Sequence, residues 1–135
     1  MKILIVEDDF VTRRLLQSFL TPYGTCDITV NGLEAIKAFK MALEEKTPYD
    51  LICLDILMPE MDGQEVLKEI RQNEKEMGIG DSDCVKIILI SILSDICNIK
   101  NAFKEQCEAF IPKPIEKKKI METLQDLGLI SFIKE

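Results

Sequence analysis

Short apolar segments alternate along the chain with longer segments in which apolar residues recur at helical spacing. The short segments are rich in Ile, Leu and Val, a pattern typical of strands buried on both faces of a parallel sheet. The segment that starts at Cys26 alternates apolar and polar residues and is expected nearer an edge, while Pro112 is expected to end the last segment. The predicted strands are Ile3–Val6, Cys26–Val30, Leu51–Leu54, Val85–Ile90 and Ala109–Ile111.

The longer segments predict helices, because their apolar residues would share one face. Asn31 stands in the place of a helix N-cap, and Gly128 stands where a helix would end. Strand and helix alternate five times, which predicts a doubly wound α/β fold with a five-stranded parallel sheet. The predicted helices are Phe10–Leu20, Gly32–Glu45, Gly63–Glu76, Ser94–Gln106 and Glu116–Leu127.

Charged and hydroxyl residues stand where the predicted strands end. The carboxyl ends of the strands of an open parallel sheet lie at one edge, and this edge carries the chemistry. We therefore expect carboxylates, one hydroxyl and one ammonium to converge there. The residues are Glu7, Asp8 and Asp9 after the first strand, Asp55 after the third, Ser91 after the fourth and Lys113 after the fifth.

The acidic residues of this set predict a site for a hard divalent cation. Carboxylates that lie close together destabilise one another, so at least one of them should resist ionisation. Oxygen ligands in a chain without histidine favour Mg²⁺ over Zn²⁺. Taken alone, each residue has a simpler explanation: the acidic residues and Ser91 as helix caps, and Lys113 as a solvated side chain. Their convergence at four strand ends favours the site.

The composition narrows the range of functions. The chain has 135 residues, which suits one domain, and a net charge of −7. An acidic chain has no general attraction for nucleic acids or anionic membranes, so we expect neither as a direct partner. The lack of histidine excludes His metal sites and His general bases. We expect a cytoplasmic protein with five buried, reduced thiols, which are Cys26, Cys53, Cys84, Cys97 and Cys107.

Four motifs lie at the predicted strand ends, namely Ile3–Asp9, Asp55–Gly63, Ile87–Ser91 and Phe110–Pro114. Together they resemble the motifs of receiver domains in bacterial two-component response regulators, and the resemblance covers essentially the whole chain. It implies a flavodoxin-like (βα)5 fold with strand order 2-1-3-4-5 and a turn that needs Gly63. We expect a single receiver domain over residues 1–135, of the stand-alone type, serving as a phosphorelay intermediate or as a regulator that docks on a protein, unless the chain is a fragment.

The resemblance implies a role for each matching residue at the predicted site. Asp55 would be the phosphoacceptor, and Asp8 would bind Mg²⁺ directly. Glu7 would help to hold the ion, and the backbone carbonyl of Leu57 would be another ligand. Lys113 would pair with a phosphoryl oxygen. The protein would catalyse only its own phosphorylation and dephosphorylation, so we do not expect an enzyme acting on other substrates.

The resemblance also implies a switch that links phosphorylation to a docking surface. Ser91 would hydrogen-bond to the phosphoryl group once it is present, and Phe110 would fill the space that Ser91 vacates. The affected surface would be formed by the fourth helix, the fifth strand and the fifth helix. The implied partners are a sensor histidine kinase or histidine phosphotransfer protein and a downstream protein target, and the same surface would support a homodimer.

Three apolar residues depart from the usual family pattern around the site. Ile92 follows Ser91, where a small residue is more common, and Leu57 and Leu93 stand where polar residues often flank the path of the hydrolytic water. We expect Ile92 to narrow access to Asp55, and the two leucines to exclude water. The phosphoryl group would then be gained slowly and lost slowly. The alternative for all three is plain packing in the core or at its rim.

Other functions fit the sequence less well. A receiver-like interaction module that does not depend on phosphorylation is the main alternative, and Ile92 is its best support. A hydrolase of the haloacid-dehalogenase kind would need an aspartate as general acid at the position of Leu57. Nucleotide-binding glycine motifs do not occur in the chain. A flavodoxin-like cofactor carrier would not account for the acidic cluster.

Overall fold

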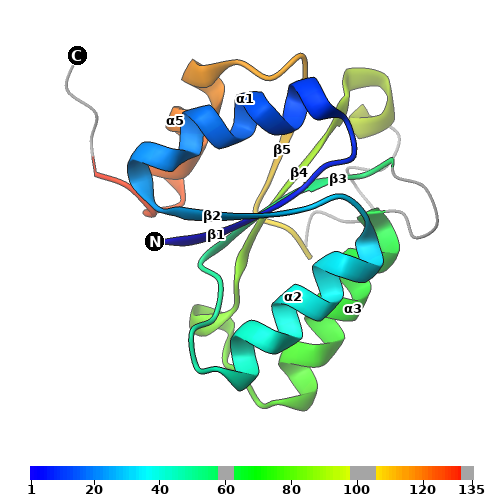
Figure 1. The fold of residues 1–135 in the computed structure, drawn as a ribbon, viewed down its shortest axis with the longest axis vertical. Helices are drawn as coiled ribbons and strands as arrows, with labels where there is room; N and C mark the ends of the chain where they lie inside the picture. The colour runs from blue at the N-terminus through cyan, green and yellow to red at the C-terminus, as the bar shows by residue number, and fades with distance from the viewer. Residues whose placement is uncertain (58–62, 98–105, 132–135) are drawn as a thin grey trace.

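A five-stranded parallel sheet forms the centre of the protein (Figure 1). The computed structural model describes residues 1–57, 63–97 and 106–131. The strand order is β2-β1-β3-β4-β5, which confirms the predicted order and fold class. The strands are β1 Lys2–Val6, β2 Thr25–Thr29, β3 Leu51–Asp55, β4 Lys86–Ile92 and β5 Ala109–Lys113.

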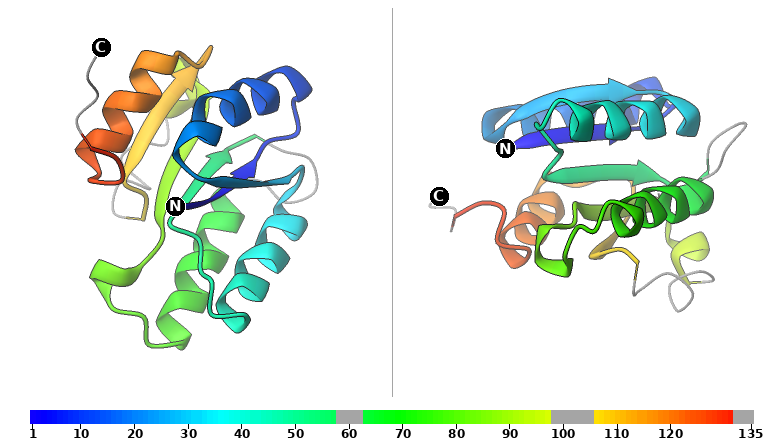
Figure 2. Two further views of the ribbon diagram at one scale, coloured as in Figure 1. Left: turned by 60° about the vertical axis from the view of Figure 1, so that its left-hand side comes forward. Right: turned by 90° about the horizontal axis from the view of Figure 1, so that it is seen from below.

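Helices cover both faces of the sheet. In Figures 1 and 2, α1 and α5 lie on one face, and α2 and α3 lie side by side on the other. Residues 93–97 are helical as well, but most of the predicted fourth helix falls outside the described residues. Within the described part of the chain, no helix has the length and apolar character needed to cross a membrane. The bounds are α1 Phe10–Leu20, η1 Thr21–Tyr23, α2 Gly32–Glu44, α3 Gly63–Glu76, η2 Asp81–Asp83 and α5 Lys117–Asp126.

Alternation along the central strands divides the core into two layers. In β1, Leu4 and Val6 face α2 and α3, whereas Ile3 and Ile5 face α1 and α5. The central strands β3 and β4 alternate in the same way, and their apolar residues are also buried on both faces. Each fully buried aliphatic side chain contributes about 1.5–3 kcal/mol relative to exposure. The continuous apolar segments therefore form the interior of the sheet, as predicted.

Two predicted helix ends are confirmed. The side chain of Asn31 accepts a hydrogen bond of 2.9 Å from the backbone N–H of Glu34, at the start of α2. After α5, Gly128 has φ of 74°, which favours glycine. The N–H of Gly128 donates to Gln125 O and the N–H of Leu129 donates to Leu124 O, as in a Schellman motif. These contacts satisfy backbone groups that the helix itself leaves without partners.

The prediction that Pro112 ends the fifth strand is wrong. Strand β5 continues to Lys113, and Pro112 lies opposite Ser91 in the register with β4. The edge position of β5 explains the difference, because an edge strand pairs on one side only and tolerates a residue without an N–H. Asp55, Ser91 and Lys113 therefore lie within the last residues of their strands rather than after them.

The prediction of five buried thiols is also wrong in part. None of the five cysteines, all of which the structure describes, forms a disulfide. Cys53 and Cys107 are buried, but Cys26 and Cys84 are half-buried and Cys97 is exposed. Cys26 lies on the edge strand β2, and Cys97 follows Ile96, which takes the buried position in the helical segment. Apolar neighbours in the sequence did not reveal these orientations.

Candidate functional site

Three predicted site residues meet at the carboxyl edge of the sheet. Glu7 follows β1 directly, and Asp55 and Lys113 are the last residues of β3 and β5. The Nζ atom of Lys113 lies 3.0 Å from Glu7 Oε1 and 3.4 Å from Asp55 Oδ2. Both carboxylates are almost completely buried, whereas the lysine side chain is 23% exposed. The parallel topology thus brings together residues that are far apart in the sequence, as predicted.

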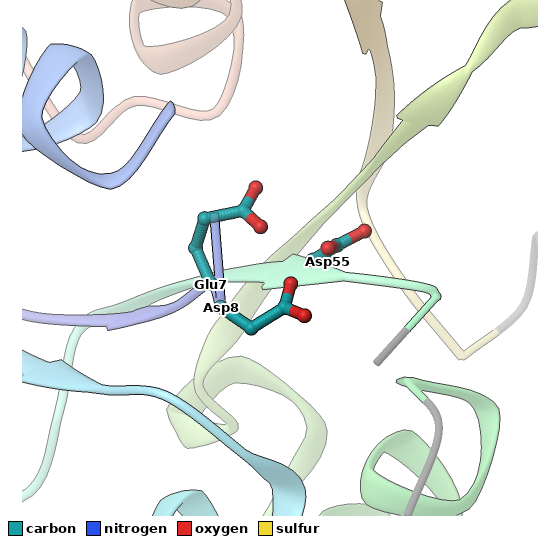
Figure 3. Close-up of side chains that lie close together, drawn as sticks. All are labelled: Glu7, Asp8 and Asp55. Atoms are coloured by element: carbon teal, nitrogen blue, oxygen red, sulfur yellow. The ribbon is translucent and has the colours of Figure 1, made fainter. Parts of the chain in front are cut away.

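Asp8 completes an acidic cluster with Glu7 and Asp55. One carboxylate oxygen from each residue lies within 4.8 Å of those of the other two. Figure 3 shows the three side chains around one space at the ends of β1 and β3. Asp8 is exposed, so the cluster is accessible from solvent on its side. An oxygen-only donor set of this kind suits a hard cation such as Mg²⁺.

Negative charge exceeds positive charge at this cluster. Burial, together with the nearby Asp55, raises the pKa of Glu7 to about 7. Burial also raises the pKa of Asp55, although Glu7 and Lys113 oppose the effect through hydrogen bonding and charge. Burial alone would lower the pKa of Lys113, but Glu7 and Asp55 outweigh it, so the pKa is raised and the ammonium persists. The predicted resistance of a carboxylate to ionisation is confirmed in its direction.

One oxygen of Glu7 is poorly satisfied. Glu7 Oε2 accepts a hydrogen bond of 3.2 Å from the backbone N–H of Asp9. Glu7 Oε1 is buried and, despite its short distance to Lys113 Nζ, accepts no hydrogen bond of good geometry in the described structure. Buried polar atoms nearly always have a partner. The donor set therefore fits an additional positive group.

Asp9 has a different role from its two acidic neighbours. Its Oδ2 atom accepts hydrogen bonds from Thr12 N at 2.9 Å and from Thr12 Oγ1 at 2.7 Å. Asp9 is thus the N-cap of α1, and the hydrogen bond from the Thr12 backbone lowers its pKa. The capping explanation holds for Asp9, whereas Glu7 and Asp8 belong to the acidic cluster. The aspartate directly before an apolar helical segment was the available signal.

The backbone around Asp55 is closely packed. The N–H of Leu57 donates to Asp55 Oδ1 at 3.2 Å, which orients the carboxylate. A Cβ atom on Gly63 would lie 2.5 Å from Asp55 O and 2.7 Å from Ile56 Cα. Gly63 is therefore required by the close approach of α3 to the end of β3, a different reason from the predicted turn. Residues 58–62 of the same motif lie outside the described residues.

The predicted switch residues, Ser91 and Phe110, lie on the neighbouring strands β4 and β5. Ser91 is 2% exposed, and its Oγ atom donates a hydrogen bond of 3.4 Å to Asp95 Oδ2. Phe110 is opposite Leu89 in the register of β4 and β5 and packs against the core below α2 and α3. Sequence reasoning missed Asp95. The available signal was a carboxylate four residues after the hydroxyl at a predicted strand end.

Three exposed apolar residues lie at or just after strand ends at this edge. Leu57 is 59%, Ile92 49% and Leu93 62% exposed, which excludes packing in the core. Ile92 lies opposite Lys113 in the β4–β5 register, and Leu57 contacts Asp55 through its backbone. All three lie at the carboxyl edge of the sheet, and we call them the apolar rim. The predicted effect on access to Asp55 stays a prediction.

Comparison with known proteins gives a consistent result. The sequence profile of the response regulator receiver domain matches residues 3–125. Over 127 residues the chain is 30% identical to the chemotaxis protein CheY of Listeria monocytogenes, covering 93% of this chain and 96% of that protein. It is also 29% identical over 134 residues to a probable histidine kinase 2 of Oryza sativa, covering 92% of this chain. The chain spans only 12% of the length of that kinase.

Solved structures show the same fold. The response regulator TrrA of Thermotoga maritima, in complex with Mg²⁺–BeF, superposes with a TM-score of 0.72 at 31% identity, covering 93% of this chain and 97% of that one. The receiver domain of Ssk1 from Saccharomyces cerevisiae, crystallised with the phosphotransfer protein Ypd1, gives 0.79 at 26% identity, with coverages of 95% and 88%. The matched profile, the sheet order and the acidic edge agree: the chain belongs to the response regulator receiver domain family.

Proposed function

We propose that this domain is the phosphoacceptor of a two-component or phosphorelay system. Asp55 accepts a phosphoryl group from a phosphohistidine on a partner protein. The observation that carries the proposal is the arrangement around the buried Asp55. Its Oδ2 atom lies 3.4 Å from Lys113 Nζ, and one of its carboxylate oxygens lies within 4.8 Å of carboxylate oxygens of Glu7 and Asp8. Family membership supports the same function.

Mg²⁺ is the cofactor that the donor set fits best. Glu7, Asp8, Asp55 and the backbone carbonyl of Leu57 would hold it. The oxygen-only ligands, the raised pKa of Glu7 and the poorly satisfied Glu7 Oε1 support this assignment. When bound, the ion would neutralise charge on the carboxylates and on a phosphoryl group. The related TrrA was crystallised in complex with Mg²⁺–BeF.

The residues of the chain itself account for the transfer. An oxygen of Asp55 attacks phosphorus and forms an acyl phosphate, while the P–N bond to the partner histidine breaks. The electron pair of that bond stays on the imidazole nitrogen, which then takes up a proton. The ammonium of Lys113 is held 3.4 Å from Asp55 Oδ2 and stabilises negative charge on the phosphoryl oxygens. Phosphoryl transfer depends mainly on such positioning and charge, so no further general base is needed.

Ser91 and Phe110 would report the phosphorylated state. The hydroxyl of Ser91 lies at the end of β4, beside β3, and can turn toward a phosphoryl group on Asp55. Phe110 is half-buried on the neighbouring strand β5, opposite Leu89, so a change at Ser91 would alter the packing of β5. A downstream protein target would read this change, and a homodimer through the fourth helix, β5 and α5 is a further prediction. Residues 98–105, which include most of the predicted fourth helix, lie outside the described residues.

The exposed apolar rim supports slow exchange of the phosphoryl group. Ile92 would obstruct small phosphodonors, and Leu57 and Leu93 would keep an attacking water from being oriented. A partner that presents phosphohistidine in a docked complex overcomes the first obstacle through proximity. The same apolar residues also suit contact with a protein, which is the observation that keeps a phosphorylation-independent interaction module as the alternative function.

The phosphodonor partner would be a sensor histidine kinase or a histidine phosphotransfer protein. The Ssk1 receiver domain was crystallised with such a phosphotransfer protein, Ypd1. The net charge of −7 supports protein partners over direct binding to nucleic acid. Tight binding to random duplex DNA at physiological salt would contradict this part of the proposal.

Mass spectrometry tests the phosphoacceptor directly. The protein is incubated with Mg²⁺ and acetyl phosphate for several hours, because labelling is expected to be slow. We expect the mass of one added phosphoryl group, lost in Asp55→Asn and retained in Asp81→Asn, a control at the opposite edge of the sheet. If neither the small donor nor a phosphorylated histidine phosphotransfer protein labels Asp55, the interaction module is the better description.

A further inference from the structure

The hydroxyl of Ser91 is already engaged in the described structure. Ser91 is 2% exposed, and its Oγ atom lies 3.4 Å from Oδ2 of Asp95. A serine hydroxyl has one hydrogen to donate, and an ionised carboxylate only accepts. Ser91 is therefore the donor, and its hydrogen cannot serve a second acceptor at the same time. Donation to Asp95 and donation to a phosphoryl group on Asp55 exclude each other.

Asp95 also belongs to an element that follows the strand without a loop. Strand β4 ends at Ile92, and residues 93–97 are helical, so Asp95 lies in the first turn of that helix. The hydrogen bond joins the end of the strand to this turn across four residues. If the Ser91 side chain turns away, the first helical turn loses that contact. A change at the hydroxyl is thereby transmitted to the helix.

We propose that Asp95 is a positioning residue that holds the Ser91 hydroxyl away from the phosphoryl site until Asp55 is modified. The Ser91–Asp95 hydrogen bond opposes the switched arrangement and sets how much of the population adopts it. The predicted effect of Asp95 on switching rests on the proposed phosphoacceptor function. The hydrogen bond itself belongs to the unmodified protein. This role of Asp95 does not require contact with metal or phosphoryl group.

The long distance of the hydrogen bond limits the expected effect. A bond of 3.4 Å is near the outer limit of useful geometry, so removing it should shift the switching equilibrium about five-fold rather than a hundred-fold. The shift must depend on the hydroxyl, because Asp95 acts through Ser91. Simple removal of a negative charge near Asp55 would instead act whether or not the hydroxyl is present.

A double-mutant cycle separates these two explanations. The apparent affinity for beryllofluoride, a phosphoryl mimic, is measured in excess Mg²⁺ for the wild type, Asp95→Ala, Ser91→Ala and the double variant. We expect Asp95→Ala to raise the affinity about five-fold, and to have no effect in the Ser91→Ala background. Asp81→Ala is the charge-matched control and should leave the affinity unchanged. An equal gain in both backgrounds would overturn the proposal in favour of charge repulsion.

A second measurement does not depend on any ligand. Three-bond NMR couplings across the Cα–Cβ bond of Ser91 report its rotamer in the unmodified protein. We expect one rotamer in the wild type and in Asp81→Ala, and rotamer averaging in Asp95→Ala. Averaging already present in the wild type would overturn the proposal. Failure of the wild type and all variants to bind beryllofluoride would instead contradict the proposed function, and the couplings would then decide the role of Asp95.

Discussion

Two charged clusters lie at opposite edges of the sheet and differ in how completely their charges are satisfied. At the amino ends of β4 and β5, Arg71 of α3 forms ion pairs of 2.7 Å with Glu74 and 2.8 Å with Glu108. At the carboxyl edge, Lys113 forms ion pairs with Glu7 and Asp55, and Asp8 lies close by. The first cluster, which we call the Arg71 network, has two carboxylates around one cation. The candidate functional site has three carboxylates close to Lys113.

Backbone groups complete the Arg71 network. Arg71 also donates to the carbonyls of Gln106 and Val85, at 2.7 Å and 2.9 Å. The N–H of Val85 donates to Glu74 Oε2, and the N–H of Ile87 donates to Glu108 Oε1. Every carboxylate of this network therefore has partners for its charge, and the network ties α3 to β4 and to the start of β5.

The difference indicates which cluster has a structural role. A buried charge that is fully hydrogen-bonded stabilises the fold only while all its partners are present. The site instead retains surplus negative charge, a raised pKa at Glu7 and a poorly satisfied oxygen. Such an arrangement lowers stability in the metal-free protein and is explained by a ligand that supplies positive charge.

Breaking the Arg71 network should give the largest loss of stability. Arg71→Met leaves the nearly buried Glu74 without its cation, so we expect the free energy of unfolding to fall by about 3 kcal/mol. Urea denaturation measures the change. Lys75→Met on the exposed part of the same helix is the control and should stay within about 0.5 kcal/mol. A loss below about 1 kcal/mol for Arg71→Met would contradict the structural role.

The same substitution should have opposite signs in the two clusters. Glu7→Gln removes surplus charge, so we expect it to stabilise the metal-free protein at pH 8 by about 1–2 kcal/mol. Glu74→Gln removes a satisfied charge from the Arg71 network and should destabilise by about 2 kcal/mol. Both are compared with the wild type by denaturant unfolding in the presence of a chelator. Destabilisation by both variants would remove the distinction between the clusters.

The contribution of Glu7 should also depend on pH. Its pKa is about 7 in the folded protein and about 4.5 when unfolded, so the folded state binds the proton more tightly. The associated stability is present below pH 4.5 and is lost as the pH rises through 7. We therefore expect the gain from Glu7→Gln to grow between these values in chelator. If the difference in unfolding free energy between Glu7→Gln and the wild type stays constant with pH, Glu7 does not titrate in this range.

Adding Mg²⁺ should stabilise the protein through the site. At about ten times the dissociation constant the gain is about 1.4 kcal/mol, seen as a higher melting temperature. Asp8→Asn should lose most of this gain, because Asp8 belongs to the acidic cluster. Asp9→Asn is the matched control, since asparagine also caps helices and Asp9 does not belong to the cluster. An unchanged melting temperature for the wild type would refute the metal site.

The smallest expected effect concerns the apolar rim of the site. Ile92→Ala should speed labelling of Asp55 by acetyl phosphate about three-fold, which is less than 1 kcal/mol of barrier. Polar residues in place of Leu57 and Leu93 should speed loss of the phosphoryl group. Met41→Ala, an equally exposed apolar position on α2, should change neither rate. A phosphoryl lifetime of seconds in the wild type would show that the apolar rim does not slow loss of the phosphoryl group and serves surface packing instead.

Much of the site followed from local patterns in the sequence. Apolar segments flanked by acidic, hydroxyl and basic residues were sufficient to predict that Glu7, Asp55 and Lys113 meet, because parallel strands end at one edge. The helix caps at Asn31 and Gly128 depend on neighbouring residues alone, and both were predicted. Strand ends were less accurate, since Pro112 lies within β5.

Local patterns along the chain were enough to predict the parallel sheet, the acidic edge and the residues at each strand end, because burial and side-chain period act over a few neighbours. The folded protein was needed to show the different roles of Asp8 and Asp9, the exposure of Cys97 and the partner of Ser91. It alone revealed the Arg71 network, whose members come from α3 and from the segments before β4 and β5. The physical reason is that hydrogen bonding and charge depend on distances of a few ångströms, which packing of remote segments sets.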